Sequence, residues 1–167
     1  MTRLHIAQAL LFVSVLAWSL WFGGLIYEMV VILPLWSASP PESVQEWNAR
    51  PQYVINPTRF YLPVALATIL SAVAASIAGW NVPRSRRLWL VIAAVCAMTT
   101  LVFTIVFFFP RNEVLFRNQS CGLTGEEITA IAHGWIRANW LRVCIMAAGF
   151  FSALRALSIL PGPEGNS

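Results

Sequence analysis

A few ionisable side chains interrupt the apolar stretches of this sequence, and they are the first candidates for chemistry. Glu28 lies within the first apolar stretch, Arg59 near the start of the second and Arg142 within the fourth. A charge in hydrocarbon is costly, so it usually marks a functional site or a partner of opposite charge. Glu28 and Arg142 therefore predict either a ligand site or a buried ion pair that fixes the order of the helices.

Helical spacing places several of these groups at one level. Glu28 lies about 7 Å, and Arg142 about 6 Å, inside the same predicted membrane surface at 1.5 Å of rise per residue. Trp135, Asn139 and Arg142 are spaced four and three apart, so they share one face of a helix. We predict an outward-facing pocket lined by Glu28, Asn56, Arg59, Asn112, His133, Asn139 and Arg142, with Tyr27 and Trp135 as apolar walls.

The elements that carry these residues are long enough to cross a bilayer. Of the 167 residues, 58% are hydrophobic and 11% are charged, whereas a soluble domain carries about 25% charge. A spanning helix needs about 20 mostly apolar residues. Residues 6–33, 57–80, 87–109 and 138–160 meet this requirement. We predict an all-α integral membrane protein, a single four-helix transmembrane domain over residues 1–167.

Capping residues and prolines define the expected ends of these helices. Pro110 is expected to close the third helix, because the residue before a proline avoids helical dihedrals. Thr124 and Glu127 form a capping-box pattern, which predicts an extended fourth helix that begins well before the membrane. A short external amphipathic helix is expected near Val44 and Trp47, with both side chains toward the bilayer surface.

The arginines set the expected orientation. Arg84, Arg86 and Arg87 occupy the short second turn, and no acid accompanies them. Positive charge is retained on the cytoplasmic side. Both termini are therefore expected in the cytoplasm, in a multi-pass protein of the plasma (inner) membrane, with the two longer loops outside.

Several chemistries lack the residues they require. The two histidines, His5 and His133, are expected at opposite membrane faces, so they cannot share a haem. The three cysteines include no C-x-x-C pair, and no glycine-rich nucleotide motif occurs. We expect no metal and no cofactor. The net charge of +4 reflects the basic turn, and no nucleic-acid partner is expected.

Four short segments resemble one family of membrane proteins. They are the run from Gly24 through Tyr27 to Pro34, Asn56-Pro57, Pro110 to Asn112, and the stripe of Trp135, Asn139 and Arg142. Together they resemble the DUF1772 group, which includes the anthrone oxygenase-like proteins. The resemblance implies a four-span bundle and, in some members, oxidation of anthrones to anthraquinones without an evident metal or flavin.

The resemblance also implies roles for individual residues. A base would deprotonate a phenolic or doubly activated carbon, giving an anion that can reduce dioxygen. His133 is the best candidate for that base, since its ordinary pKa suits neutral pH. Arg142 and Arg59 would stabilise the oxyanion, and Asn112 or Asn139 would orient it.

Three interpretations of function stay open at this point. The first is a protein that binds or oxidises a hydrophobic aromatic molecule. The second is a structural or accessory subunit in which Glu28 and Arg142 only fix helix packing. The third is a transporter, which four spans without an inverted repeat make difficult unless the chain forms a homo-oligomer. The lipid bilayer is a partner in every case.

Overall fold

The structure is a computed structural model that describes residues 3–50, 57–117 and 122–159. These ranges contain helices and no strand. In chain order they are α1 (Arg3–Tyr27), the π-helical η1 (Glu28–Ile32), α2 (Leu33–Ser37), α3 (Glu42–Ala49), α4 (Thr58–Ala78), α5 (Arg84–Phe103), the π-helical η2 (Thr104–Phe108), α6 (Phe109–Phe116) and α7 (Gly125–Ser158).

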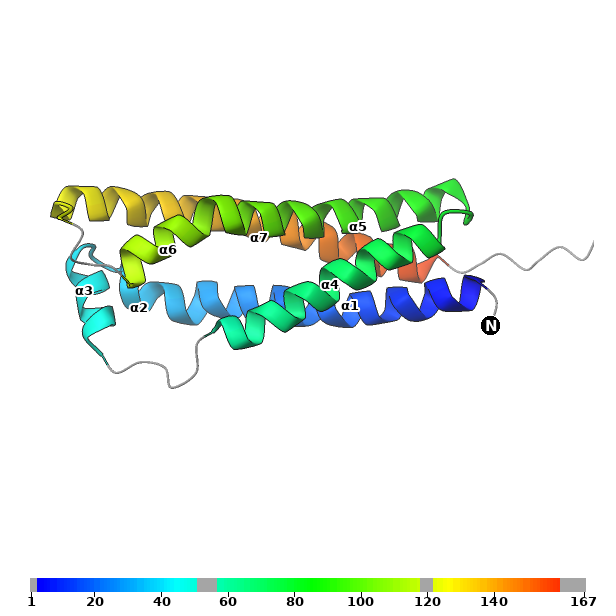
Figure 1. The fold of residues 1–167 in the computed structure, drawn as a ribbon, viewed down its shortest axis with the longest axis horizontal. Helices are drawn as coiled ribbons and strands as arrows, with labels where there is room; N and C mark the ends of the chain where they lie inside the picture. The colour runs from blue at the N-terminus through cyan, green and yellow to red at the C-terminus, as the bar shows by residue number, and fades with distance from the viewer. Residues whose placement is uncertain (1–2, 51–56, 118–121, 160–167) are drawn as a thin grey trace, which may run out of the picture.

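Four helical segments of the described chain are long and apolar enough to cross a membrane. They are His5–Ser37, Thr58–Ala78, Arg84–Phe116 and Gly125–Ser158. This confirms the predicted all-α membrane bundle. The start of α1, the α4–α5 turn and the end of α7 lie together at one end of the bundle, which we call the terminal end (Figure 1). The opposite end, formed by α2, α3, α6 and the start of α7, is called the loop end.

The fourth helix is the long rod that its capping residues predict. The backbone N–H of Glu127 donates to the Thr124 hydroxyl at 3.3 Å, and the Thr124 N–H donates to the Glu127 carboxylate at 2.7 Å. From this capping box α7 runs for 34 residues. That length is about 51 Å, against a hydrocarbon core of about 30 Å. The helix therefore extends beyond the membrane at one or both of its ends.

The prediction that Pro110 closes the third helix is wrong, since the helix continues to Phe116. A proline lacks the N–H that normally bonds four residues back, and its ring collides with that carbonyl. In η2 the turn widens instead, and the Phe109 N–H bonds to the carbonyl of Thr104. The same widening precedes Pro34, where the Leu33 N–H bonds to the carbonyl of Glu28. Each π-helical turn thus accommodates the proline that follows it.

The short external helix exists as α3, but its apolar face is not free for the bilayer. Val44 is buried against the loop end, and Trp47 packs against the same cluster. The Asn48 amide also donates to the Leu115 carbonyl at 2.8 Å, which ties α3 to α6. The predicted surface-lying orientation is therefore corrected, because α3 covers the end of the bundle instead (Figure 1).

The buried apolar side chains form two clusters with a polar level between them. The cluster toward the terminal end includes Trp18, Leu25, Ala97 and Met146, and packs α1, α4, α5 and α7 together. The cluster toward the loop end comprises Met29, Leu33, Trp36, Val44, Phe108, Leu115, Ala132 and Trp135. Five polar residues fall between members of the two clusters along their own helices: Glu28, Thr100, Thr104, Asn139 and Arg142. We call these five residues the polar layer.

Close contact between α1 and α7 depends on one glycine. A Cβ atom added at Gly149 would overlap the buried indole of Trp18, and it would lie 2.9 Å from the Cβ of Cys96. Trp18 itself stacks on Trp21 with ring centroids 5.8 Å apart. Because helices in lipid associate through close van der Waals contact at small residues, this position fixes the approach of the two helices.

We expect Gly149→Ala to lower the thermal stability of the detergent-solubilised protein. Overpacking of this kind costs about 1–3 kcal/mol. Gly134→Ala is the matched control on the same helix, since a Cβ there meets no atom within 4 Å. Size-exclusion chromatography after heating measures the fraction that stays folded. Equal loss in both variants would contradict the assigned role of Gly149.

Candidate functional site

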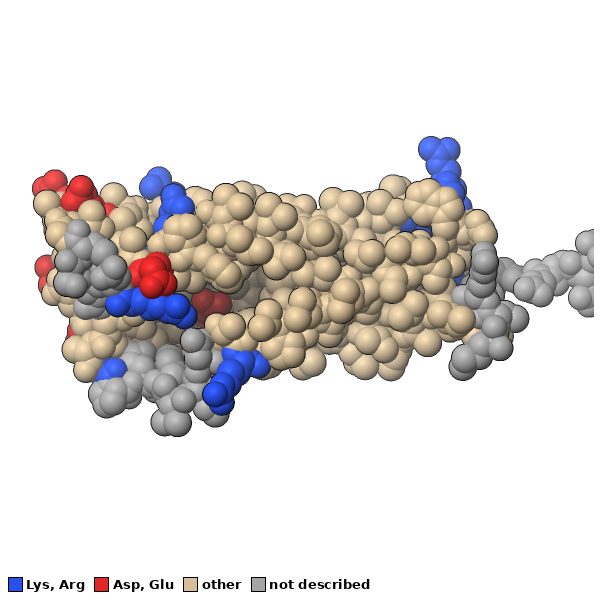
Figure 2. All heavy atoms as spheres, viewed as in Figure 1, with Lys and Arg blue, Asp and Glu red and all other residues tan. Residues whose placement is uncertain are grey.

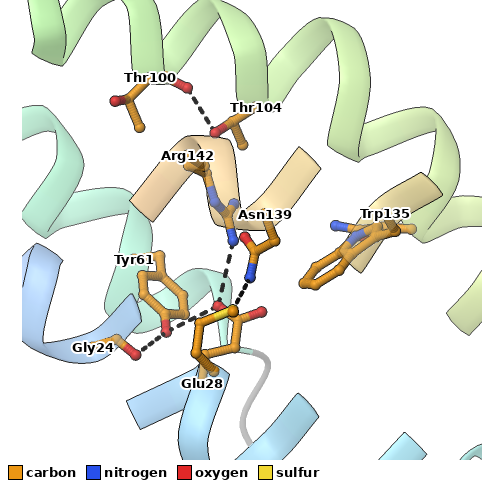
Figure 3. A network of polar contacts seen from close by, with 10 residues as sticks. Gly24, Glu28, Tyr61, Thr100, Thr104, Trp135, Asn139 and Arg142 are labelled. Atoms are coloured by element: carbon orange, nitrogen blue, oxygen red, sulfur yellow. Dashed lines mark hydrogen bonds and ion pairs between the residues drawn. The ribbon is translucent and has the colours of Figure 1, made fainter. Parts of the chain in front are cut away.

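The polar layer brings a carboxylate and a guanidinium from two helices together, as the sequence predicts. The Arg142 Nη2 atom lies 3.6 Å from the Glu28 Oε2 atom, and the side chains are 12% and 25% exposed, respectively (Figure 3). Glu28 is the first residue of η1, and Arg142 comes from the middle of α7. The two charges compensate each other in apolar surroundings, where either one alone would be costly.

A third group, which the sequence analysis did not select, joins this pair. The Tyr61 hydroxyl of α4 has a single proton, which is shared between the Gly24 carbonyl at 3.0 Å and the Glu28 Oε2 atom at 3.4 Å (Figure 3). Donors from α4 and α7 thus converge on a single carboxylate oxygen. The sequence position of Tyr61 could have indicated this role. Its hydroxyl lies one turn inside an apolar span, at the depth expected for Glu28.

The guanidinium of Arg142 also lies over aromatic rings. Its central carbon is 4.2 Å from the centroid of Phe108 and 5.8 Å from that of Trp135. A cation over an aromatic face is held by the ring quadrupole, and the attraction strengthens where water is excluded. Among the described residues, the buried Nε atom has no hydrogen-bond partner. The ring faces fix the direction of the guanidinium and leave one donor unused.

Two amide side chains extend the polar layer toward the loop end. Asn139 is fully buried, and its amide nitrogen points at the sulfur of Met29 (Figure 3). Its Oδ1 atom has no partner within the described part of the chain. Asn112 accepts a hydrogen bond of 2.7 Å from the indole N–H of Trp135. Asn139 therefore has an unused acceptor beside Arg142, and Asn112 fixes the indole ring of Trp135 there.

The surface is hollowed beside the carboxylate. Figure 2 shows acidic atoms set back in a hollow on the lateral face of the bundle, near the loop end. Glu28 is the one acidic side chain of the described residues that is not exposed. The Glu28 side chain itself is 25% exposed, so the carboxylate is not sealed inside the bundle.

The structure does not bring every selected residue to this point. Tyr27 is 58% exposed, and Arg59 is exposed on the first turn of α4. His133 is exposed as well, and nine residues separate it from Arg142. At 3.6 residues per turn this spacing is about two and a half turns, so the two side chains leave α7 on opposite faces. Asn56 lies outside the described residues.

The arrangement can exchange a proton and hold an oxygen anion. The carboxylate of Glu28 can accept a proton, while the Arg142 guanidinium pairs with it at 3.6 Å and the Tyr61 hydroxyl lies 3.4 Å from the same oxygen atom. Donors that are already oriented stabilise a developing negative charge more than water does, because they need not reorganise. Within residues 3–50, 57–117 and 122–159, no cluster of three His, Cys, Asp or Glu side chains could hold a metal ion.

Comparison with known proteins identifies the family. The family model described as anthrone oxygenase matches residues 51–152, which is more than half of the chain. This segment includes Tyr61, Asn112, Trp135, Asn139 and Arg142, whereas Glu28 precedes it. Neither the curated proteins nor the solved structures yield a match. The family resemblance noted in the sequence is confirmed, and the chain belongs to the anthrone oxygenase family.

Proposed function

We propose that this protein is a membrane-embedded oxygenase that converts an anthrone-like aromatic ketone to a quinone with dioxygen. The observation that carries the proposal is the convergence of Arg142 and Tyr61 on the recessed carboxylate of Glu28. The membership of the anthrone oxygenase family supplies the substrate class. With the arginine-rich terminal end inside, as the sequence predicts, the hollow lies in the outer half of the membrane.

The surroundings of the polar layer suit a flat, hydrophobic substrate. Phe60 is 45% exposed beside Tyr61, and the two rings meet edge to face with centroids 5.1 Å apart. Phe108 and Trp135 form the opposite, buried wall in the same geometry at 5.2 Å. Aromatic side chains favour ring substrates through offset or edge-on contacts. A tricyclic ketone would enter from the bilayer, where it is more soluble than in water.

The first step is a proton transfer to Glu28. Its carboxylate removes a proton from the methylene carbon opposite the ketone, and the negative charge spreads onto the ketone oxygen. Arg142 is then released from its pairing with the carboxylate and can bind that oxygen, with Tyr61 as a second donor. The negative charge thus moves from the carboxylate to the ketone oxygen, and the guanidinium can pair with either group. No uncompensated charge forms in the apolar surroundings at any stage.

Dioxygen is the oxidant in the remaining steps. The substrate anion gives one electron to dioxygen, and the resulting radical and superoxide combine as a peroxide anion at the same carbon. The proton held by Glu28 then converts this anion to a hydroperoxide. The O–O bond breaks as the second methylene proton leaves the carbon, and that proton and the departing hydroxide form water while a carbonyl group remains. One oxygen atom enters the quinone, the other leaves as water, and dioxygen accepts four electrons.

We expect Glu28→Gln and Arg142→Gln to lower the rate of anthrone oxidation by about a hundredfold or more, since each removes a proton acceptor or an oxyanion donor. The assay uses the full-length protein in lipid nanodiscs and follows quinone absorbance and oxygen consumption. With ¹⁸O₂, the wild-type product should carry one labelled oxygen atom. Glu46→Gln is the matched control, because that carboxylate pairs with Arg50 on the exposed surface of α3.

Substitution of His133 distinguishes this mechanism from the one predicted from the sequence. If His133 is the base, His133→Ala abolishes turnover and Glu28→Gln does not. If Glu28 is the base, Glu28→Gln abolishes turnover and His133→Ala does not. Folded Glu28→Gln protein that oxidises anthrone at the wild-type rate would refute the assigned site.

The accessory interpretation rests on the same ion pair, and a charge exchange tests it. We expect Glu28→Arg to destabilise the bundle by placing two cations together, and Arg142→Glu in the same chain to restore folding. A catalytic carboxylate must face the hollow, so the doubly exchanged protein should fold and remain inactive. Thermal stability and anthrone turnover are measured on the same samples. Recovery of turnover by the double variant would favour a purely structural pair.

A further inference from the structure

A second candidate binding site lies on the opposite half of the bundle, far from the polar layer. It is a groove of about 510 Å³ between α5 and α7, lined by Trp89, Ile92, Ala148, Phe151, Ser152 and Arg155. Sites that hold small molecules commonly have volumes of about 300–1,000 Å³. This groove is large enough to hold part of a lipid.

Helical periodicity explains its shape. Phe151 and Ser152 lie three and four residues after Ala148, and Arg155 lies four and three residues after them, so the four residues form one stripe along α7. Small side chains at two of these positions leave a channel, and Trp89 and Phe151 wall it. The stripe is about 10 Å long and ends at Arg155, in the last turn of α7. The groove is thus apolar along its length and cationic at its end.

Among the described residues, those that carry charge at this end are basic. Arg84, Arg86, Arg87 and Arg155 lie in the first turn of α5 and the last turn of α7. Every described acidic residue belongs to the polar layer or the loop end, and Figure 2 shows blue without red at the terminal end. The ion pairs Arg50–Glu46, Arg117–Glu113 and Arg142–Glu28 lie in the other half of the molecule.

One of these arginines is buried at the seam beside the groove. Arg86 is 4% exposed, and its Nε atom donates to the carbonyl of Ala156, which adjoins Arg155, at 3.1 Å. Its Nη1 atom is buried without a hydrogen-bond partner in the described ranges. No carboxylate of the described residues lies at this end, so the positive potential of these arginines is not compensated within the described ranges. An anionic group bound at the mouth of the groove would compensate it.

We propose that the groove binds an anionic phospholipid of the leaflet at the terminal end. An acyl chain occupies the apolar channel, and the phosphate lies at Arg155, where Trp89 has the interfacial position that indoles favour. Basic residues near a membrane surface attract anionic lipids, and a zwitterionic lipid gains little from the same charges. The predicted cytoplasmic location of this end places it in the leaflet that carries anionic lipids. The site is independent of the oxygenase chemistry.

A second groove at the same end provides an internal comparison. It has a volume of about 480 Å³ and is lined by Ile6, Ile77, Ala78, Trp80 and Asn81. Its size is similar, but its lining includes no charged residue, and the Arg87 guanidinium lies over the Trp80 ring at 5.2 Å from the centroid. If apolar volume alone retained lipid, both grooves would bind all phospholipids alike. Selectivity for an anionic headgroup is therefore the property that identifies the groove at Arg155.

Native mass spectrometry of the full-length protein tests the site with phosphatidylglycerol and phosphatidylcholine of identical acyl chains. We expect phosphatidylglycerol to remain bound more tightly, and Arg155→Gln to weaken its binding by about fivefold, the effect of one basic residue near the surface. Ala148→Phe fills the channel at an exposed position and should weaken binding without a change of charge. Arg117→Gln, at the loop end, is the control that leaves binding unchanged.

Other outcomes would overturn the proposal. Equal binding of the two lipids, or unchanged binding in Arg155→Gln, would remove the headgroup site. Displacement of the lipid by millimolar inorganic phosphate would show an anion site without a role for the acyl chain. A dimer that Ala148→Phe converts to monomer would assign the groove to contact between two copies. None of these results bears on Glu28, whose test is anthrone turnover.

Discussion

The compensation of two opposite charges within a membrane-spanning bundle is the interaction on which the rest of this structure depends. Glu28 and Arg142 come from different helices and lie where one apolar core ends and the next begins. Neither charge is tolerable alone in hydrocarbon, so the helices that carry them must meet at this level. Tyr61 and the ring of Phe108 then complete the surroundings of the pair. The order of the helices and the separation of the two cores are both consistent with this one contact.

The two π-helical turns are part of the same arrangement. Each begins at a residue of the polar layer, Glu28 in η1 and Thr104 in η2, and each is followed by a proline after the next residue. A π-helical turn inserts an extra residue and is frequent at functional sites. Here it keeps Met29 and Phe108 directed inward while the helix passes the proline. The local distortion therefore serves both the continuity of the helix and the position of the carboxylate.

Much of this architecture could be predicted from the sequence because apolar length and isolated charge are strong signals in membrane proteins. The four spans, the capped start of α7 and the meeting of Glu28 with Arg142 were accessible in this way. The continuation past Pro110 was not, since a proline rule does not anticipate a widened turn. The roles of Tyr61 and Phe108 depend on contacts between helices, which spacing along one chain does not reveal. His133 was selected for the acid–base chemistry of its side chain. Its position nine residues before Arg142 places it on the opposite face of α7, where it is exposed.

Gly24 sets the distance between α1 and the first turns of α4. Its missing side chain lets the rings of Phe60 and Tyr61 lie against the backbone of α1, where a Cβ atom would come within 2.9 Å and 3.2 Å of them. The same two rings stand at the polar layer, because the Tyr61 hydroxyl donates to the carbonyl of Gly24 itself. Any larger residue at position 24 would push both rings away from α1 and carry the hydroxyl away from the Glu28 carboxylate. The smallest side chain of the helix therefore sets how closely a phenol can approach the buried acid.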